Sequence, residues 1–229
     1  MKIGIMQPYI FPYIGYFQLI NAVDKFIIYD DVQFIKGGWI NRNYILLQHE
    51  KHLFNLLLNG ASANKLINEI AVNSNQLKLL KTIENCYRKA PYFDTVYPVI
   101  NRILNYNDNN LAKYVGSSIL EIAIYLNINT EIVYSSDLKK DNTLKAQEKV
   151  IDICKLLNAD TYINSIGGLE LYNKFDFEEN NISLLFISSK NINYKQFNDD
   201  FISSLSIIDV LMFNSIEEIR EMLNQYSLI

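Results

Sequence analysis

Histidine and cysteine are scarce in this 229-residue sequence, which has two of each. Because His49 and His52 are the only histidines, neither a histidine-based metal site nor a Ser-His-Asp triad is expected. Cys86 and Cys154 do not have the spacing of a metal site, and we interpret them as buried thiols in a reducing compartment. The chemistry of the protein is therefore expected to rest on other side chains.

The sequence also lacks a long apolar run and an excess of positive charge. The longest apolar run, at 119–126, is interrupted by Glu121 and is too short to span a bilayer, so no membrane insertion is expected. Residues 1–6 do not have the cationic region and long apolar run of a signal peptide. With a formal net charge of −4 and a pI near 5.3, the chain is not expected to bind DNA. These features predict a cytoplasmic protein.

Proline and glycine are sparse as well, with four and eight copies. Two of the prolines and three of the glycines fall within residues 6–42, together with the only tryptophan, Trp39. A chain that has few such residues uses them where the backbone must adopt a special conformation. We therefore interpret residues 6–42 as the functional site and the rest of the chain mostly as scaffold.

Short apolar runs alternate with amphipathic stretches along most of the chain, which is typical of α/β proteins. The expected strands are 2–6, 26–29, 52–58, 67–72, 131–134, 161–164 and 182–187. The expected helices are 13–23, 76–89, 93–105, 111–127, 143–157, 165–174, 205–213 and 216–226. We predict a Rossmann-like, mostly parallel sheet with a helical insertion and a helical C-terminus.

The length of the chain and the absence of linkers or low-complexity tracts favour one domain over residues 1–229. Its sheet core is expected at 1–74 and 128–229. The helical block at 75–127 is expected to be an insertion that packs on the sheet.

Two adjacent carboxylates, Asp30 and Asp31, follow the expected strand at 26–29. There they would lie at the carboxyl edge of the sheet, where open α/β sheets bind ligands. Because neighbouring side chains of a strand point to opposite faces, only one of the two is expected to enter the site. It would bind an amine or act as a general base. A solvated strand end is the alternative interpretation.

The segment KGGWINR at 36–42 combines two glycines with an aromatic residue between two cations. Lys36 and Arg42 could hold a diphosphate, Arg42 through two parallel hydrogen bonds. Trp39 offers a face for stacking. A hairpin with a packed tryptophan is the alternative interpretation.

The spacing Pro12-Tyr13-Ile14-Gly15-Tyr16 resembles a loop of the nucleotidylyltransferase and class I synthetase superfamily, which has the form Pro-His-x-Gly-His. In that superfamily the glycine lets a nucleotide lie against the backbone and the histidines hold phosphate. Tyr13 and Tyr16 stand at the histidine positions, so the resemblance implies a site geometry more than that chemistry. Aromatic packing at a helix start is the alternative interpretation.

Several motifs occur in order along almost the whole chain. They are Met6-Gln7-Pro8-Tyr9, Pro12, Gly15, Asp30-Asp31, Gln33-Phe34, Lys36, Trp39, Asn41-Arg42, Ala90-Pro91-Tyr92, Tyr194, Gln196 and Leu205-Ser206-Ile207-Ile208-Asp209. This combination resembles the WbqC-like family. The resemblance implies a role in surface-polysaccharide (O-antigen) biosynthesis, for which glycine transfer to an amino sugar has been suggested. Two departures are Met6, where many members have His, and Ser215, where Gly is expected.

The motifs and the residue chemistry together predict an enzyme that transfers an aminoacyl (glycyl) or similar acyl group to the amine of a nucleotide-linked amino sugar. Asp30 or Asp31 would take the proton of the amine, and Gln7 would contribute to stabilising the oxyanion. The candidate substrate-binding residues are Tyr9, Pro12, Gly15, Tyr16, Gln33, Lys36, Trp39, Asn41, Arg42, Tyr194 and Gln196.

The sequence leaves the acyl donor open between an adenylate made from ATP and Mg²⁺, a thioester and an aminoacyl-tRNA. No cofactor is certain from the sequence, although ATP with Mg²⁺ or an activated acyl donor fits, and no residues are assigned to a metal site. It also leaves the oligomeric state open, a homodimer included. The alternatives are a nucleotidylyltransferase or adenylate-forming enzyme, and a non-catalytic sugar-nucleotide-binding or assembly protein.

Overall fold

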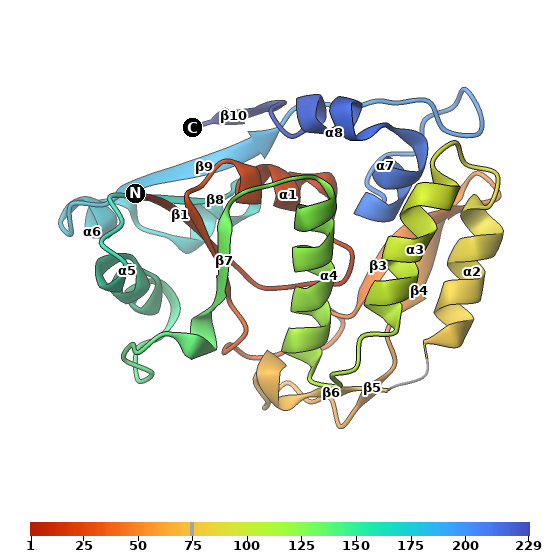
Figure 1. Ribbon diagram of the computed structural model, residues 1–229. Helices are drawn as coiled ribbons and strands as arrows, with labels where there is room; N and C mark the ends of the chain where they lie inside the picture. Colours follow the sequence, from red (N-terminus) through yellow and green to blue (C-terminus); the bar gives the residue numbers. More distant parts are fainter. Residues whose placement is uncertain (74–75) are drawn as a thin grey trace.

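The computed structural model describes residues 1–73 and 76–229 (Figure 1). Among these residues, six strands form the main sheet in the order β10-β9-β8-β1-β2-β7. They are β1 Lys2–Met6, β2 Lys25–Ile28, β7 Glu131–Tyr134, β8 Thr161–Ser165, β9 Ser183–Ser189 and β10 Tyr226–Leu228. The predicted boundary between sheet core and helical block, at 74 and 75, lies outside the described residues.

The sheet is parallel except at one edge. β1 pairs with β2 and β8, β2 with β7, and β8 with β9, all in parallel, while β10 runs antiparallel to β9. The prediction of an α/β fold with a mostly parallel sheet is confirmed. The carboxyl ends of β2 and β7 are neighbours, because Ile28 pairs with Tyr134.

Helices and two small antiparallel hairpins surround the sheet. The helices are α1 Ile14–Asn21, α2 Leu77–Tyr87, α3 Phe93–Leu104, α4 Leu111–Tyr125, α5 Ala146–Leu156, α6 Lys174–Glu178, α7 Ile207–Phe213 and α8 Ile216–Met222. The 3₁₀ helices are η1 Ile67–Glu69, η2 Ser135–Asp137 and η3 Ile166–Leu171. The hairpins are β3 Arg42–Leu47 with β4 Glu50–Asn55, and β5 Leu58–Asn59 with β6 Ala71–Val72.

The core lies on both faces of the sheet, because the strands alternate their side chains between the faces. In β2, Phe26 and Ile28 join the large core cluster that includes α1 and the predicted helical insertion, α2 to α4. Ile27 joins a second cluster with residues of α5 and α6. Figure 1 shows α4 and α5 beside β7.

The hairpin of β3 and β4 corrects the prediction around residues 36–58. Gln48 and His49 connect the two strands with φ angles of 50° and 66°, which suit the tight turn of a two-residue hairpin. Neither is the Gly or Asn that usually marks such a turn, so β3 was not predicted. The single strand expected at 52–58 is divided between β4 and β5.

Three further segments differ from the predictions. The strand expected at 67–72 begins as η1, because the Glu69 carboxylate accepts a hydrogen bond from the Leu66 N–H at 2.8 Å and closes a turn. The segment expected as a helix at 165–174 forms the 3₁₀ helix η3 instead. The next helix, α6, begins at Lys174, where the side chain of Asn173 caps it by accepting a hydrogen bond from the Phe175 N–H. The helix expected at 216–226 ends at Met222, and β10 follows.

Ser215, which departs from the expected glycine, has a defined structural role. Its Oγ accepts a hydrogen bond from the Glu218 N–H at 3.2 Å, and the Glu218 carboxylate accepts one from the Ser215 N–H at 2.7 Å. This reciprocal capping box satisfies two backbone donors at the start of α8. The departure therefore begins a helix instead of disturbing the turn.

Gly116 of α4 packs directly on Tyr134 of β7, and we expect Gly116→Ala to destabilise the protein. A Cβ atom at 116 would lie 2.8 Å from Cζ of Tyr134, whose ring also has the Lys113 Nζ 3.7 Å from its centroid. Overpacking of this kind costs about 1–3 kcal/mol, which exceeds the gain in helix propensity of about 1 kcal/mol. Thermal unfolding should show a transition several degrees lower.

Gly167→Ala is the matched control for this substitution. The nearest atom to a Cβ at 167 is the Ser165 Oγ, at 3.9 Å. The control should unfold close to the parent protein. Equal stability of the two variants would show that Tyr134 moves aside freely.

Candidate functional site

The carboxyl ends of β2 and β7 lead into two polar segments that lie side by side. Tyr29, Asp30 and Asp31 follow β2, and η2 follows β7. This edge is where parallel α/β sheets bind ligands, because the connections that leave the strands surround an opening there. The structure places a cavity at this edge.

The cavity has a volume of about 690 Å³ and lies between the residues after β2, η1, η2 and the start of α5. Its polar lining residues are Asp31, Gln33, Asn68, Ser136, Asn142, Lys145 and Lys149. Tyr29, Val32, Leu66, Leu144 and Ala146 complete the wall. Such a mixture of apolar wall and polar groups is typical of small-molecule sites.

One carboxylate in this wall pairs with two lysines. Oδ2 of Asp31 lies 2.8 Å from Nζ of Lys140 and 2.9 Å from Nζ of Lys149. The side chain of Asp31 is 10% exposed, that of Lys140 1% and that of Lys149 8%, so the ion pairs are nearly buried. Oδ1 of Asp31 is buried, and the side chain of Ser135 also acts on this carboxylate, because its hydrogen bond contributes to lowering the pKa of Asp31.

The two lysines determine the charge state of Asp31. Burial alone would raise the pKa of its carboxyl group, but the hydrogen bonds from Lys140 and Lys149 outweigh burial and bring the pKa below its usual value. Asp31 is therefore ionised at neutral pH. Burial and the negative charge of Asp31 raise the pKa of Tyr29, which stays neutral and has Nζ of Lys149 at 5.2 Å from its ring centroid.

Asp30 has a different role from its neighbour. It is 1% exposed and is not among the residues that line the cavity. Its carboxylate accepts hydrogen bonds from the Ser136 N–H at 3.0 Å, the Ser136 hydroxyl at 2.6 Å and the Asn68 amide at 3.4 Å. Asp30 thus ties η1 and η2 together, and Asp31 is the carboxylate that reaches the cavity.

Comparison with known proteins gives the family of the chain. A family model described as the WbqC-like protein family matches residues 7–221. The chain belongs to this family. The uncharacterized protein Rv1507c of Mycobacterium tuberculosis is similar to it, with 27% identity over 218 residues that cover 93% of each chain. No solved structure matches the chain.

The first WbqC-like motif surrounds the start of α1. The hydroxyl of Tyr16 donates to the carbonyl of Gln7 at 3.3 Å, and the hydroxyl of Tyr9 accepts from the Tyr13 N–H at 3.0 Å. The rings of Tyr9 and Tyr16 meet edge to face at 5.3 Å, and Tyr16 is 3% exposed. This is aromatic packing at a helix start.

The two small residues of this motif pack in the same region. Pro12 is buried, and its carbonyl accepts a hydrogen bond from the Ile207 N–H at 2.9 Å. A Cβ atom at Gly15 would lie 2.8 Å from the Ser189 Oγ, so this glycine lets α1 approach β9 closely. Neither residue lines the cavity at Asp31.

The second motif divides between the cavity and the turn before β3. Gln33 lines the cavity, while Lys36, Trp39 and Arg42 do not. The Arg42 guanidinium donates to the Gly37 carbonyl and lies 5.4 Å from the centroid of the Trp39 ring, which is 50% exposed. The Trp39 ring also lies 5.6 Å from the Tyr44 ring, so the tryptophan is partly packed beside the hairpin. The diphosphate role of Lys36 and Arg42 stays a prediction.

Asn41 has a structural contact in the same turn. Its side-chain amide donates to the Leu56 carbonyl at 3.0 Å, and its own carbonyl accepts from the Leu56 N–H at 2.7 Å. These two hydrogen bonds connect the residue before β3 to the residue after β4.

Tyr194 and Gln196 converge on a buried carboxylate of the last WbqC-like motif. The hydroxyl of Tyr194 and the amide of Gln196 both donate to Oδ2 of Asp209 at 2.7 Å, and the hydroxyl of Tyr87 donates to Oδ1 at 2.9 Å. Asp209 is fully buried. None of the four residues lines the cavity at Asp31.

Sequence reasoning missed most of the cavity wall. The missed polar lining residues are Asn68, Ser136, Asn142, Lys145 and Lys149. Lys140, which pairs with Asp31 but does not line the cavity, was missed as well. One signal for Lys149 was present, because it stands four residues before the buried Ile153 and therefore on the inward face of α5. A lysine on an inward face usually has a buried counter-ion.

Among residues 1–73 and 76–229, no helix is long and apolar enough to cross a membrane.

Proposed function

We propose that this WbqC-like protein transfers an aminoacyl group, glycyl or similar, to the amine of a nucleotide-linked amino sugar in surface-polysaccharide (O-antigen) biosynthesis. The observation that carries the proposal is the cavity of about 690 Å³ at the carboxyl edge of the sheet, with Asp31 and Lys149 in its wall. An amino sugar nucleotide carries one cationic amine and one diphosphate. The wall offers a partner for each.

Asp31 is the partner of the amine in this proposal. The carboxylate is ionised, and Asp31 lines the cavity. An ionised carboxylate attracts a cationic ammonium group more strongly than a neutral hydroxyl group, because hydrogen bonds between charged partners are the stronger ones. The site would therefore select an amino sugar over a sugar with a hydroxyl group at the same position.

Lys149 and Lys145 are the partners of the diphosphate. An ammonium group has three N–H donors, and Nζ of Lys149 uses two of them for the carbonyl and Oδ2 of Asp31. The third donor is available for a phosphate oxygen. Lys145 lines the cavity from an exposed position at the start of α5 and adds a second cation. We thus assign the diphosphate to these lysines instead of Lys36 and Arg42.

The low pKa of Asp31 sets how it can assist the reaction. A weakly basic carboxylate does not deprotonate a free ammonium group, so the ammonium group must lose a proton to solvent before the neutral amine attacks. When its nitrogen forms a bond to the acyl carbon, the nitrogen becomes cationic and much more acidic. Asp31 can then take that proton while the bond to the leaving group of the donor breaks. The donor remains open between an adenylate, a thioester and an aminoacyl-tRNA.

Thermal unfolding with separate ligands tests the acceptor site. Thymidine- and uridine-diphosphate amino sugars at about 100 times their dissociation constant should stabilise by about 2.7 kcal/mol, or roughly 5–10 °C. The same nucleotide sugars with a hydroxyl in place of the amine should give smaller shifts. Lys145→Ala should reduce the shift, because it removes a cation from the cavity.

Lys139→Ala is the matched control, since Lys139 is exposed and does not line the cavity. Equal shifts in Lys145→Ala and Lys139→Ala would contradict the placement of the diphosphate. A shift with ATP and Mg²⁺ alone would favour adenylate or nucleotidyl transfer. If a nucleotide amino sugar binds, incorporation of labelled glycine in the presence of each donor class is the next measurement.

A further inference from the structure

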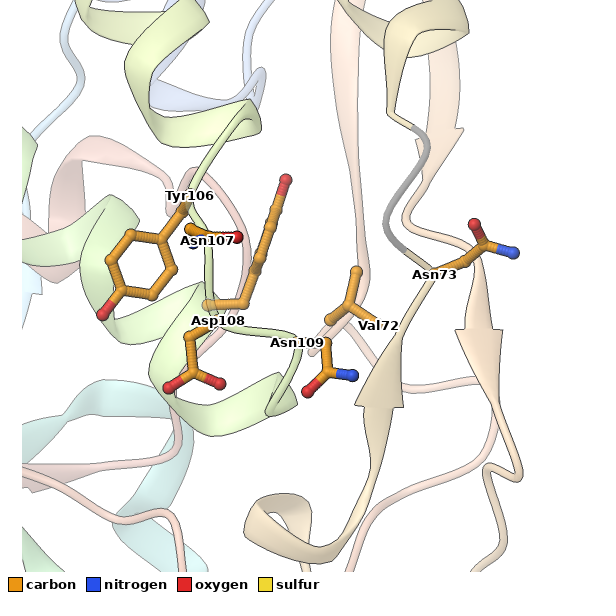
Figure 2. A pocket seen from close by; sticks show the side chains of 7 residues that line it. Val72, Asn73, Tyr106, Asn107, Asp108 and Asn109 are labelled. Atoms are coloured by element: carbon orange, nitrogen blue, oxygen red, sulfur yellow. The ribbon is translucent and has the colours of Figure 1, made fainter.

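A second cavity lies in the helical insertion, apart from the one at Asp31. It has a volume of about 370 Å³ and lies between β6 and the connection from α3 to α4. Figure 2 shows Tyr106, Asn107, Asp108 and Asn109 on this connection, with Val72 of β6 opposite. The motifs at residues 6–42, 194–196 and 205–209 contribute no residue to its lining.

Two tyrosines form one part of this cavity, and only one of them is open. Tyr114 is 3% exposed, and its hydroxyl donates to the Leu104 carbonyl at 2.9 Å. Tyr106 is 43% exposed and meets Tyr114 edge to face, with 6.3 Å between the ring centroids and 71° between the planes. Tyr114 therefore supports Tyr106 through this edge-to-face contact, and the exposed part of the Tyr106 side chain borders the cavity.

The connection that carries the polar side chains is held firmly. The Asn109 carbonyl accepts a hydrogen bond from the Val72 N–H at 2.7 Å, and Oδ1 of Asp108 accepts one from the Asn110 N–H at 2.9 Å. Oδ2 of Asp108 makes no hydrogen bond to another described residue. The side chains of Asn107 and Asn109 are exposed. A carboxylate oxygen and two amides thus border the cavity on a fixed backbone.

The described lining residues include no Lys, Arg or His. A phosphate or another anion would meet the carboxylate of Asp108 without a cation to balance it, so anionic ligands are disfavoured. A carboxylate and amides instead suit a ligand that both donates and accepts several hydrogen bonds. An open tyrosine face suits an apolar C–H surface on the same ligand.

We propose that this second cavity binds a neutral saccharide. A sugar ring combines adjacent hydroxyl groups with an apolar C–H face, and these match Asp108 and Tyr106. A volume of 370 Å³ is at the lower end of the range of small-molecule sites and fits a short saccharide. The assignment adds a binding site to the proposed function and does not rest on it.

Hydrogen bonds connect the walls of the two cavities. The side-chain amide of Asn110 donates to the Asn68 carbonyl at 2.6 Å, and the side-chain amide of Asn68 donates to Asp30 at 3.4 Å. Asn68 lines the first cavity, and Asn110 holds Asp108 in the second. The two sites therefore lie on one hydrogen-bonded framework.

Saturation-transfer NMR with unlabelled saccharides tests this inference. The probes are glucose, galactose, mannose, N-acetylglucosamine and their disaccharides, each at 1–10 mM as an order-of-magnitude range for weak ligands. At least one should receive saturation from the protein. Tyr106→Ala should weaken that binding about tenfold, and Asp108→Asn about fivefold, because a charged acceptor is replaced by a neutral one.

The variants are chosen so that they fold. Tyr106 is on the surface, and an asparagine at 108 can still accept the hydrogen bond of the Asn110 N–H. Asp94→Asn, at an exposed position in the first turn of α3, is the matched control and should bind like the parent protein. Lys145→Ala should also leave saccharide binding unchanged, because Lys145 lines the other cavity.

Three results would overturn the assignment. The first is that no neutral saccharide receives saturation. The second is saccharide binding that is insensitive to Tyr106→Ala and Asp108→Asn. The third is saccharide binding that Lys145→Ala abolishes, which would place the sugar in the first cavity. Failure of aminoacyl transfer would leave each of these results unchanged, so the two proposals fail separately.

Discussion

Replacing Asp31 by alanine is expected to lower the free energy of unfolding by about 3–5 kcal/mol, the usual cost of removing one partner of a buried ion pair. The substitution leaves Lys140 and Lys149, whose side chains are 1% and 8% exposed, without their counter-ion. In a chain of this size the loss corresponds to a fall of roughly 10 °C in the unfolding temperature. Urea unfolding at pH 7 measures the free energy directly.

Asp137→Ala is the matched control for this substitution. Asp137 is 65% exposed, and its carboxylate lies 3.8 Å from Nζ of Lys113. An exposed pair of this kind contributes about 0–1 kcal/mol. If Asp31→Ala were no less stable than Asp137→Ala, the lysines at Asp31 would have to be hydrated or to point away from the carboxylate.

The stability that Asp31 contributes should depend on pH with a defined sign. Because its folded-state pKa is below the usual value of about 4, the folded protein binds the proton more weakly than the unfolded chain does. The contribution is fully present above about pH 4 and is lost as the pH falls through the lowered pKa. The difference in unfolding free energy between the parent protein and Asp31→Ala should therefore shrink as the pH falls below about 4.

The sheet could be predicted because its strands are short, buried and bounded by turn residues. The range predicted for β7, 131–134, agrees with Glu131–Tyr134, and the range for β1, 2–6, agrees with Lys2–Met6. β10 could not be predicted in this way, because Tyr226–Leu228 carries no strong strand pattern. It becomes a strand through antiparallel pairing with Ser189, Ser188 and Ile187 of β9. This is a tertiary interaction that overrides local preference.

The candidate site shows the same division between local and distant signals. Asp31 follows a recognisable strand, so its place at the carboxyl edge could be inferred from the sequence. Lys140 and Lys149 are more than one hundred residues away, and parallel pairing of β2 with β7 brings their segment to Asp31. No short motif contains this information.

The motif Tyr194-x-Gln196 illustrates the opposite case. Its place among the motifs that resemble the WbqC-like family suggested a substrate site. In the structure its side chains donate to the Asp209 carboxylate. A polar motif can therefore be a requirement of folding: a buried carboxylate needs several donors, and these must come from fixed positions.

Asp209→Ala is expected to lower the free energy of unfolding by about 4 kcal/mol. It removes the common acceptor of three donors, the hydroxyls of Tyr87 and Tyr194 and the amide of Gln196. Each buried donor left without an acceptor costs about 1–3 kcal/mol, and the costs do not simply add. The network also joins separate segments, since the Tyr87 hydroxyl accepts a hydrogen bond from the Leu46 N–H of β3 at 2.9 Å.

Asp209→Asn distinguishes the loss of hydrogen bonds from the loss of charge. The asparagine keeps one oxygen acceptor, so about half of the destabilisation of Asp209→Ala is expected. Burial raises the pKa of Asp209 above its usual value, although the hydrogen bonds of Tyr194, Gln196 and Tyr87 oppose it. The folded protein therefore binds this proton more tightly than the unfolded chain, and its stability falls as the pH rises from about 4 through the raised pKa.

The two carboxylates thus predict opposite pH dependences within one protein. The difference in unfolding free energy between the parent protein and Asp209→Asn should be largest in acid and should shrink as the pH rises, whereas the difference for Asp31→Ala should grow. Urea unfolding from pH 3 to 8 measures both. If the difference for Asp209→Asn grew with pH, the three donors would stabilise the anion by more than burial destabilises it. Asp209 would then be a preformed negative charge in the core, and Tyr87, Tyr194 and Gln196 would serve to hold that charge.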